Sequence, residues 1–257
     1  MANEFDGLAA VVTGAARGIG RAIAEELRDR GAELVLIDVN AEGVRAAAEA
    51  MGGKDAGVNC LVVDLGHPEE ISKLTAEVQR LTGRVDILVN NAGIEMDSPF
   101  REITSEQFDR VIAVNLRAPL LMVQALAPLF PVSGGAILNI SSIHADHAFT
   151  NSIPYACSKA GLVAQTRNLA LELAPQHIRV NAICPGYVDT PMWEEWLRTA
   201  PDPEAVAAQT AALHPLGRRG LPKDVAVAAA FLTSPHTTWV TGTCLVVDGG
   251  LTVRTHP

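Results

Sequence analysis

Three residues near the middle of the chain have types and spacing that suit proton transfer at an alcohol or a ketone. Tyr155 and Lys159 are four residues apart, so a helix that begins near Tyr155 places both side chains on one face. An ammonium beside a phenol stabilises the phenolate, which predicts a Tyr155 pKa below the usual value of about 10. Ser142 ends an apolar run, and its hydroxyl can bond a substrate oxygen. Together the three residues predict a general acid–base site.

A glycine-rich turn near the N-terminus has the composition of a phosphate-binding loop. It reads Thr13-Gly14-Ala15-Ala16-Arg17-Gly18-Ile19-Gly20 and lies between a predicted strand and a predicted helix. Its glycines permit a tight turn and a close approach of the backbone to a pyrophosphate, and the start of the helix favours negative charge. We therefore expect Gly14, Arg17, Gly18, Ile19 and Gly20 to bind a dinucleotide cofactor.

The end of the second predicted strand indicates which dinucleotide is preferred. Asp38 stands there, where a carboxylate can accept both ribose hydroxyls of an adenosine and repel a 2′-phosphate. Arg17 is the opposing signal, because its guanidinium could reach a phosphate. The carboxylate opposes the added charge directly, so we expect NAD, with NADP the less favoured cofactor. Asp64, at the end of the third predicted strand, is expected to hydrogen-bond the adenine edge.

The remaining chain alternates between short apolar runs and amphipathic segments. Apolar strands separated by helices predict an α/β fold: a doubly wound Rossmann fold with about seven parallel strands and helices on both faces. Strands are expected at residues 8–13, 33–38, 59–64, 85–90, 136–141, 177–184 and 243–247. Helices are expected at residues 18–30, 41–51, 68–81, 105–129, 154–174 and 222–232.

No linker, repeat or low-complexity segment interrupts this alternation, so residues 1–257 are predicted to form one dinucleotide-binding domain. The predicted helix 105–129 contains Pro119 and is expected to be bent or irregular there. Residues 186–220 are proline-rich and carry two tryptophans. We expect them to form a mobile helical flap over a pocket.

Composition limits the possible partners. The chain of 257 residues is 48% hydrophobic and 19% charged, with a net charge of −9, which argues against binding to nucleic acid or to an anionic membrane. Residues 1–7 are not typical of a signal peptide, and no apolar run reaches the length of a membrane span. The four cysteines form no Cys-x-x-Cys pair, so no metal site is predicted. We expect a cytoplasmic protein.

Several further motifs accompany these residues at characteristic spacing. In chain order the motifs are Thr13-Gly14-x-x-x-Gly18-x-Gly20, Asp64-Leu65, Asn90-Asn91-Ala92-Gly93, Asn115, Ser142, Tyr155-x-x-x-Lys159 and Pro185-Gly186. Because they occur jointly and in this order, the chain resembles the classical short-chain dehydrogenases/reductases over essentially its full length.

The resemblance implies a role for each matching position. Tyr155 is implied to donate or accept the proton, Lys159 to bond the nicotinamide ribose, and Ser142 to orient the substrate oxygen. Asn115 is implied to extend a proton relay through water from Lys159. The other implied cofactor contacts are Leu65, Asn91, Ala92, Gly93, Pro185, Gly186, Val188 and Thr190.

Three polar residues stand where this family lines its substrate pocket. These are Glu95, His144 and Asn151, and their donors and acceptors suit a substrate with several hydroxyls. The segments around Glu95 and His144 are similar to those of bacterial glucose 1-dehydrogenases. We therefore expect hydride transfer between NAD and a secondary alcohol or ketone, most simply a sugar, a polyol or another small hydroxylated compound.

Two alternatives remain open. A 3-oxoacyl-(acyl-carrier-protein) reductase resembles this chain throughout, but the predicted helices lack the basic cluster that attracts an acidic carrier, and the net charge is −9. A non-catalytic dinucleotide-binding protein is disfavoured because the catalytic residues are all present. Helices 105–129 and 154–174 are apolar on more than one face, and the resemblance implies a homotetramer built on them.

Overall fold

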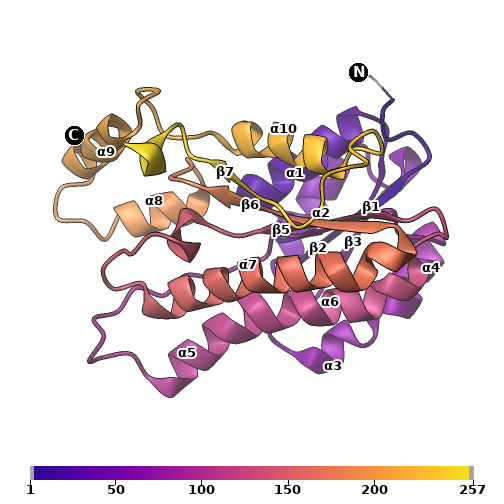
Figure 1. Cartoon of the computed structure of the whole chain (residues 1–257), viewed down its shortest axis with the longest axis horizontal. Helices are drawn as coiled ribbons and strands as arrows, with labels where there is room; N and C mark the ends of the chain where they lie inside the picture. The colour runs from indigo at the N-terminus through magenta and orange to yellow at the C-terminus, as the bar shows by residue number, and fades with distance from the viewer. Residues whose placement is uncertain (1–2, 255–257) are drawn as a thin grey trace.

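A seven-stranded, all-parallel sheet forms the centre of the computed structural model, which describes residues 3–254 (Figure 1). The strand order is β3-β2-β1-β4-β5-β6-β7, so the chain reverses its direction across the sheet between β1 and β4. The strands are β1 (Ala9–Thr13), β2 (Glu33–Asp38), β3 (Val58–Val62), β4 (Ile87–Asn90), β5 (Gly135–Ile140), β6 (Ile178–Pro185) and β7 (Cys244–Val247). The predicted doubly wound fold is confirmed.

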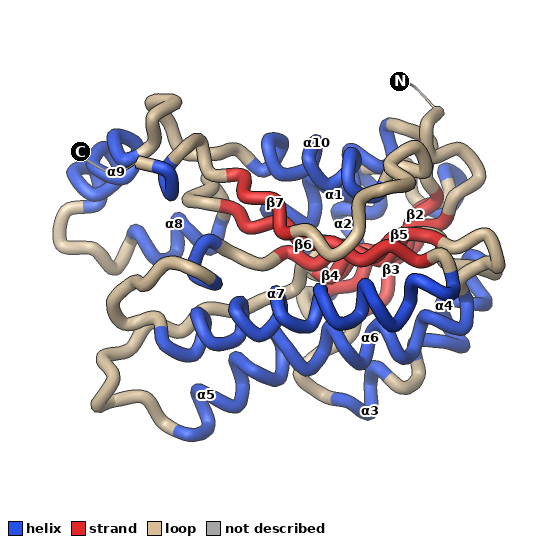
Figure 2. The backbone as a smooth tube through the Cα atoms, viewed as in Figure 1, coloured by secondary structure: helices blue, strands red, loops and turns tan. Residues whose placement is uncertain are grey.

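Helices cover both faces of the sheet (Figure 2). On one face lie α1 (Gly18–Asp29), α2 (Ala41–Ala50) and α10 (Pro222–Thr233). On the other lie α3 (Pro68–Ile71), α4 (Leu74–Thr82), α5 (Ser105–Ile112), α6 (Ala118–Leu126) and α7 (Ile153–Leu173). Two further helices, α8 (Pro191–Leu197) and α9 (Pro203–Leu213), extend beside the carboxyl ends of the last strands.

Alternate residues of β1, β2, β4 and β5 belong to two separate hydrophobic cores. In β1, Val12 packs with Ile23 of α1 and Ala229 of α10, whereas Val11 packs with Met122 of α6 on the opposite face. A strand buried on both faces needs a continuous apolar sequence, which is why the apolar runs predicted these strands. Parallel pairing then brings all the carboxyl ends of the strands to one edge, where loops can assemble a site.

The long helical stretch Ser105–Leu129 is irregular one turn before the expected position. A π-helical turn, Ala113–Arg117, joins α5 to α6 ahead of Pro119. Proline has no N–H to give to the carbonyl of residue 115, four positions earlier, so an ordinary α-helical ladder cannot run through this turn. The widened turn carries Asn115, one of the predicted site residues.

The same stretch corrects the expectation that no apolar run reaches the length of a membrane span. An 18-residue part of Ser105–Leu129 has a mean hydropathy of 1.5, so by length and composition alone this helix could cross a membrane, but half of that part is buried inside the molecule. Met122 and Leu126 are fully buried against the sheet. A helix that is apolar because it lies in a protein core meets the same criteria.

The other differences concern element ends. The predicted helix at residues 68–81 is two helices, α3 and α4, separated at Ser72–Lys73. The third strand ends at Val62, so Asp64 lies in the loop beyond it rather than at its end. The segment expected to form the flap, residues 186–220, begins with a bridge between Val188 and Gly220 that pins its two ends together. Between these ends lie α8 and α9.

Candidate active site

The predicted catalytic side chains meet at the carboxyl end of β5 and the first turns of α7. The hydroxyl of Ser142 hydrogen-bonds to the phenol of Tyr155, and Ser142 Oγ lies 3.1 Å from His144 Nδ1. Lys159 is 3% exposed, and its Nζ donates to the carbonyl of Ile140 at 2.8 Å. The same Nζ stands 5.4 Å from the centre of the Tyr155 ring. One helix face therefore presents Tyr155 and Lys159 together, as their spacing predicted.

The expected lowering of the Tyr155 pKa was wrong for this structure. Burial raises the pKa of the phenol above its usual value, the negative charge of Glu95 adds to the rise, and the hydrogen bond with Ser142 offsets only part of it. Burial also lowers the pKa of Lys159 to about 8, against the opposing effect of Glu95. Burial thus dominates both groups, so Tyr155 is a protonated phenol near neutral pH.

Asn115 links three segments of the site. Its Oδ1 accepts a hydrogen bond from the backbone N–H of Ile94 at 2.9 Å, and its Nδ2 donates to the carbonyl of Ile94 at 2.8 Å. Nδ2 also donates to Ser158 Oγ at 3.1 Å. A Cβ added to Gly93 would stand 3.4 Å from Asn115 Oδ1 and 3.5 Å from Lys159 Nζ. Asn115 therefore fixes the loop after β4 beside the lysine.

The glycine-rich turn packs closely on the loop that follows β4. Thr13 Oγ1 accepts hydrogen bonds from the backbone N–H groups of Asn91 and Ala92, both at 3.0 Å. Asn91 Nδ2 donates to the carbonyls of Thr13 at 2.9 Å and Gly14 at 3.1 Å. A Cβ on Gly20 would lie 2.2 Å from the carbonyl oxygen of Gly14, so this position must be glycine. The side chain of Asn91 thus shapes the turn.

Asp38 reaches the glycine-rich turn from the end of β2. Its Oδ2 accepts from the backbone N–H of Ala16 at 3.0 Å, and its Oδ1 accepts from that of Asn40 at 2.9 Å. Arg17, the next residue along the turn, forms an ion pair with Glu195 of α8 at 2.5 Å. Asp38 therefore bonds the residue directly before Arg17, and the guanidinium of Arg17 already has an acidic partner.

Asp64 is held by a different cation. Both of its carboxylate oxygens accept from Arg110 Nη2, at 3.1 and 3.0 Å, and Oδ1 also accepts from the N–H of Gly66 at 2.8 Å. These bonds offset burial and keep the pKa of Asp64 below its usual value. The neighbouring Leu65 is 7% exposed and packs in the core. A contact of Asp64 with adenine stays a prediction, and its carboxylate would have to share these partners.

The residues expected to border nicotinamide lie at the start of the flap. Pro185 ends β6, and Gly186 packs so closely that a Cβ there would lie 2.8 Å from Asp248 Cβ. Val188 is buried, and Thr190 caps α8 by accepting from the backbone N–H of Trp193 at 3.2 Å. A Cβ on Gly18, whose φ is +59°, would stand 3.6 Å from Thr190 Cβ, so the flap begins beside the glycine-rich turn.

These residues fit a dinucleotide. The glycines of the turn leave the backbone accessible at the start of α1, where the first N–H groups of the helix have no partner within it. The Lys159 ammonium has three N–H donors, and in residues 3–254 it gives one hydrogen bond, to Ile140. Two donors therefore remain for ribose hydroxyls. Gly14, Gly18, Ile19 and Gly20 all belong to this turn and the first turn of α1.

Two carboxyl groups lie in the loop after β4. Burial raises the pKa of Glu95 to about 7, and the charge of nearby Asp97 adds to the rise. Ser152 Oγ donates to Glu95 Oε1 at 3.4 Å, and Trp196 Nε1 of α8 donates to Asp97 Oδ2 at 2.6 Å. Burial also raises the pKa of Asp97. A carboxyl group that is costly to ionise is suited to hydrogen bonding with a polar ligand.

His144 and Asn151 both belong to the loop between β5 and α7 but differ in burial. Burial lowers the pKa of His144 to about 4, and the charge of Lys159 adds to the effect, so the imidazole is neutral. Its ring stacks on Phe149 at 3.9 Å and meets the edge of Tyr155 at 5.2 Å. Asn151 is exposed, with a φ of +62°, and its carbonyl accepts from the N–H of Ser98 at 2.9 Å. Only the backbone contact of Asn151 ties it to the Glu95 loop.

The sequence analysis did not predict the cluster of aromatic side chains that lies beside His144. Tyr187 meets Phe149 at 6.2 Å and Trp193 at 5.3 Å, and Trp193 meets Trp196 at 4.9 Å. Asp97 was also missed, although it lies two residues after Glu95 in the same loop. The sequence indicated the two tryptophans only as apolar residues of the flap. Nothing in the sequence pointed to Phe149 except that it lies near His144 in the chain.

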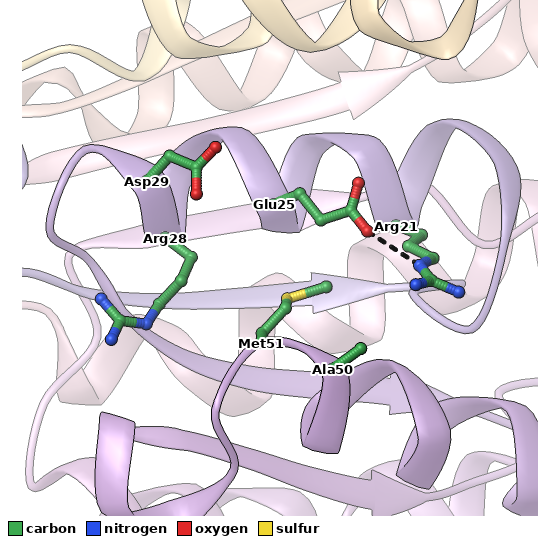
Figure 3. Close-up of a pocket in the computed structure, with 6 residues that line it drawn as sticks. All are labelled: Arg21, Glu25, Arg28, Asp29, Ala50 and Met51. Carbon is green, nitrogen blue, oxygen red and sulfur yellow. Dashed lines mark hydrogen bonds and ion pairs between the residues drawn. The ribbon is translucent and has the colours of Figure 1, made fainter.

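A separate surface depression lies between α1 and the end of α2 (Figure 3). Its lining residues are Arg21, Glu25, Arg28, Asp29, Ala50 and Met51. The side chains of Arg21 and Glu25 bond each other at 2.9 Å across one turn of α1. The depression shares no residue with the predicted site. Within residues 3–254, no group of three or more His, Cys, Asp or Glu side chains could hold a metal ion.

Comparison with known proteins defines the class. Residues 14–252 match the family model described as enoyl-(acyl carrier protein) reductase, and relatives above 30% identity align over nearly the whole chain. The chain belongs to the classical short-chain dehydrogenases/reductases. It is therefore an oxidoreductase that acts on an alcohol or ketone with a nicotinamide dinucleotide.

Individual relatives within this class differ in substrate. The chain is 34% identical to the 3-oxoacyl-[acyl-carrier-protein] reductase of Thermotoga maritima, over 97% of this chain and 100% of that one. It is 36% identical to the L-fucose dehydrogenase of Bos taurus, over 97% of this chain and 91% of that one. The aldohexose dehydrogenase structure of Thermoplasma acidophilum has a TM-score of 0.89 at 31% identity, covering 100% of this chain and 98% of that one.

Proposed function

We propose that this protein is an NAD-dependent dehydrogenase of a sugar, a polyol or another small hydroxylated secondary alcohol. The observation that carries the substrate proposal is the partly buried carboxyl group of Glu95, whose charge acts on Tyr155, together with the neutral ring of His144 beside Ser142. The position of Asp38 against the glycine-rich turn supports NAD over NADP.

In this proposal Tyr155 and Ser142 act on the substrate oxygen. A nicotinamide bound here would take hydride from the alcohol carbon in oxidation, with Tyr155 in its phenolate form accepting the hydroxyl proton, and would return hydride in reduction. The phenol of Tyr155 gives its proton to the carbonyl oxygen in reduction, and the protonated phenol is the form present near neutral pH. Ser142 donates a hydrogen bond to the same oxygen as charge develops on it. Lys159 holds a ribose hydroxyl, and Asn115 positions the loop beside it.

The carboxyl group of Glu95 supports a polar substrate, because a partly buried polar group with few hydrogen bonds costs free energy until a ligand bonds it. Glu95 is partly buried and, within residues 3–254, has one hydrogen bond, from Ser152, at the long distance of 3.4 Å. A substrate hydroxyl can donate to this carboxyl group or accept from its protonated form. The aromatic rings of Phe149 and Tyr187 offer flat apolar surface for the carbon face of a sugar ring. A plain aliphatic ketone has one oxygen, for Tyr155 and Ser142, and no hydroxyl for Glu95.

The direct test is a matrix of initial rates followed through NADH or NADPH absorbance. NAD and NADP are each combined with aldoses, polyols and simple secondary alcohols. We expect a kcat/KM for NAD at least tenfold above that for NADP, and the best rates with polyhydroxylated substrates. Equal or better use of NADP would contradict the cofactor proposal. Glu95→Ala and His144→Ala should each raise the KM of the best polyol, and unchanged KM values would contradict the polar pocket.

A second candidate is a 3-oxoacyl-(acyl-carrier-protein) reductase. The relative from Thermotoga maritima, which aligns over its whole length, favours it. Reduction of an acetoacetyl thioester by NADPH, without turnover of polyols, would establish this activity instead. The net charge of −9 works against docking of an acidic carrier, so we rank this function second.

A further inference from the structure

One ion pair joins the predicted cofactor loop to the flap. Arg17 Nη1 lies 2.5 Å from Glu195 Oε1, and Nη2 lies 3.3 Å from Oε2, so the contact uses both ends of each group. Arg17 immediately precedes α1, whereas Glu195 belongs to α8, 178 residues further along the chain. The side chains are 55% and 50% exposed, so a soluble ligand can reach the pair.

The Arg17–Glu195 pair lies next to Asp38, the carboxylate that binds the adenosine ribose in the proposed function. Asp38 Oδ2 accepts from the N–H of Ala16, the residue directly before Arg17. Arg17 is the one basic residue of the turn Thr13–Gly20. A 2′-phosphate on a ribose bound at Asp38 therefore approaches the same short segment. It meets two carboxylates, Asp38 and Glu195, against one guanidinium.

We propose that Glu195 determines cofactor specificity by holding Arg17 and thereby disfavours NADP. The proposal rests on the NAD preference of the proposed function and adds a second residue to it. Asp38 repels the phosphate directly, while Glu195 occupies the donors that a phosphate needs. NADP has to displace Glu195 from Arg17 or bind without that cation. NAD carries no phosphate at this position, so it does not compete with Glu195.

The expected effect is moderate because the pair is exposed. Ion pairs between solvent-exposed groups contribute about 0.2–1 kcal/mol, which corresponds to about 1.4- to 5-fold in binding. Removing the carboxylate also removes one negative charge near the phosphate. We expect Glu195→Gln and Glu195→Ala to tighten NADPH binding by about three- to tenfold. Binding of NADH should change by less than about twofold.

The experiment measures dissociation constants of NADH and NADPH for the full-length protein by nucleotide fluorescence, without substrate. Glu194→Gln is the matched control, because Glu194 is an exposed neighbour in the same helix and carries the same charge. It should leave the NADPH to NADH ratio unchanged. An equal gain in Glu194→Gln would overturn the proposal, since the effect would then be general charge rather than the pair with Arg17.

Arg17→Ala, alone and combined with Glu195→Gln, completes a double-mutant cycle. The gain from Glu195→Gln should fall in the Arg17→Ala background to the small part that comes from the lost negative charge, and it should shrink at about 1 M salt, where charges are screened within about 3 Å. Unchanged NADPH binding in Glu195→Gln, or a gain that is undiminished without Arg17, would overturn the proposal. Failure of the proposed function is distinguishable, because it is read from wild-type substrate rates and from the wild-type cofactor preference, not from these variants.

Discussion

At the scale of single residues, the phenol of Tyr155 is the group on which the proposed chemistry depends. Its neighbours Ser142 and Lys159 can position a substrate or a ribose, but neither can replace it as the acid. Tyr155→Phe keeps the ring that meets His144 edge-on and removes only the hydroxyl. We expect kcat to fall by about 10²- to 10⁴-fold while the dissociation constant of NADH stays within a few-fold. Stopped-flow rates and NADH fluorescence check both, and a fully active variant would refute the mechanism.

Glu95 carries a prediction about stability and pH. Burial raises its pKa from 4.5 to about 7, so the folded state binds this proton more tightly than the unfolded chain does. The stability from the protonated form is complete below about pH 4.5 and is lost as pH rises through about 7. Glu95→Gln mimics the protonated form, so its advantage over the wild type should grow over this window, to about 3 kcal/mol at most.

Urea unfolding of Glu95→Gln and the wild type at about pH 5 and pH 8 measures this difference. Glu102→Gln, an exposed glutamate beyond the same loop, is the control and should show no such change. A constant difference between Glu95→Gln and the wild type at both pH values would mean that Glu95 is ionised throughout. The pocket would then be more polar than its burial indicates.

The sequence indicated which side chains would lie together here, because the signals are local. Four residues of helical spacing bring Tyr155 and Lys159 together, and the ends of β1, β2 and β5 carry Gly14, Asp38 and Ser142 to one edge of the sheet. The pKa direction of Tyr155 could not be read in the same way. It depends on how much water the surrounding loops exclude, and spacing within a helix does not contain that information.

At the scale of elements, the contacts of the flap were outside the reach of sequence patterns. Trp196 bonds Asp97 across 99 residues, and Glu195 bonds Arg17 across 178, without any periodicity that links them. The π-helical turn was predicted only in part. Pro119 indicated that the helix is irregular, but not that the irregularity lies in the turn before the proline. Local propensity identifies elements, whereas tertiary packing decides where they end.

The bond between Trp196 and Asp97 predicts how firmly α8 is held over the loop after β4. Trp196→Phe keeps an aromatic ring beside Trp193 but removes the N–H that donates to Asp97. We expect faster amide hydrogen exchange in residues 191–213 and a KM for the substrate raised by about two- to tenfold, with kcat changed less. Trp239→Phe is the control, because Trp239 is 98% exposed. Unaltered exchange in Trp196→Phe would show that this bond does not hold the flap.

At the scale of the whole molecule, several of the exposed apolar side chains lie on two separate surfaces. Val227 and Phe231 of α10 are 47% and 54% exposed, and Val246 of β7 is 47% exposed. On the other side of the sheet, Leu171 of α7 is 78% exposed. A tetramer with two kinds of two-fold interface needs two self-complementary surfaces on each chain. The sequence analysis pointed to the surface of α7 and the long helix.

We therefore expect a homotetramer in which α10 and β7 form one interface and α7 forms the other. Phe231→Glu places a charge in the first interface and leaves the second unchanged, so it should convert tetramers into dimers rather than monomers. Val132→Glu is the control, because Val132 is 97% exposed in the loop before β5 and lies outside both surfaces. Sedimentation velocity at micromolar concentration distinguishes the species. A wild-type protein with the mass of one chain would contradict the tetramer, and Phe231→Glu monomers would mean that α7 supports no interface of its own.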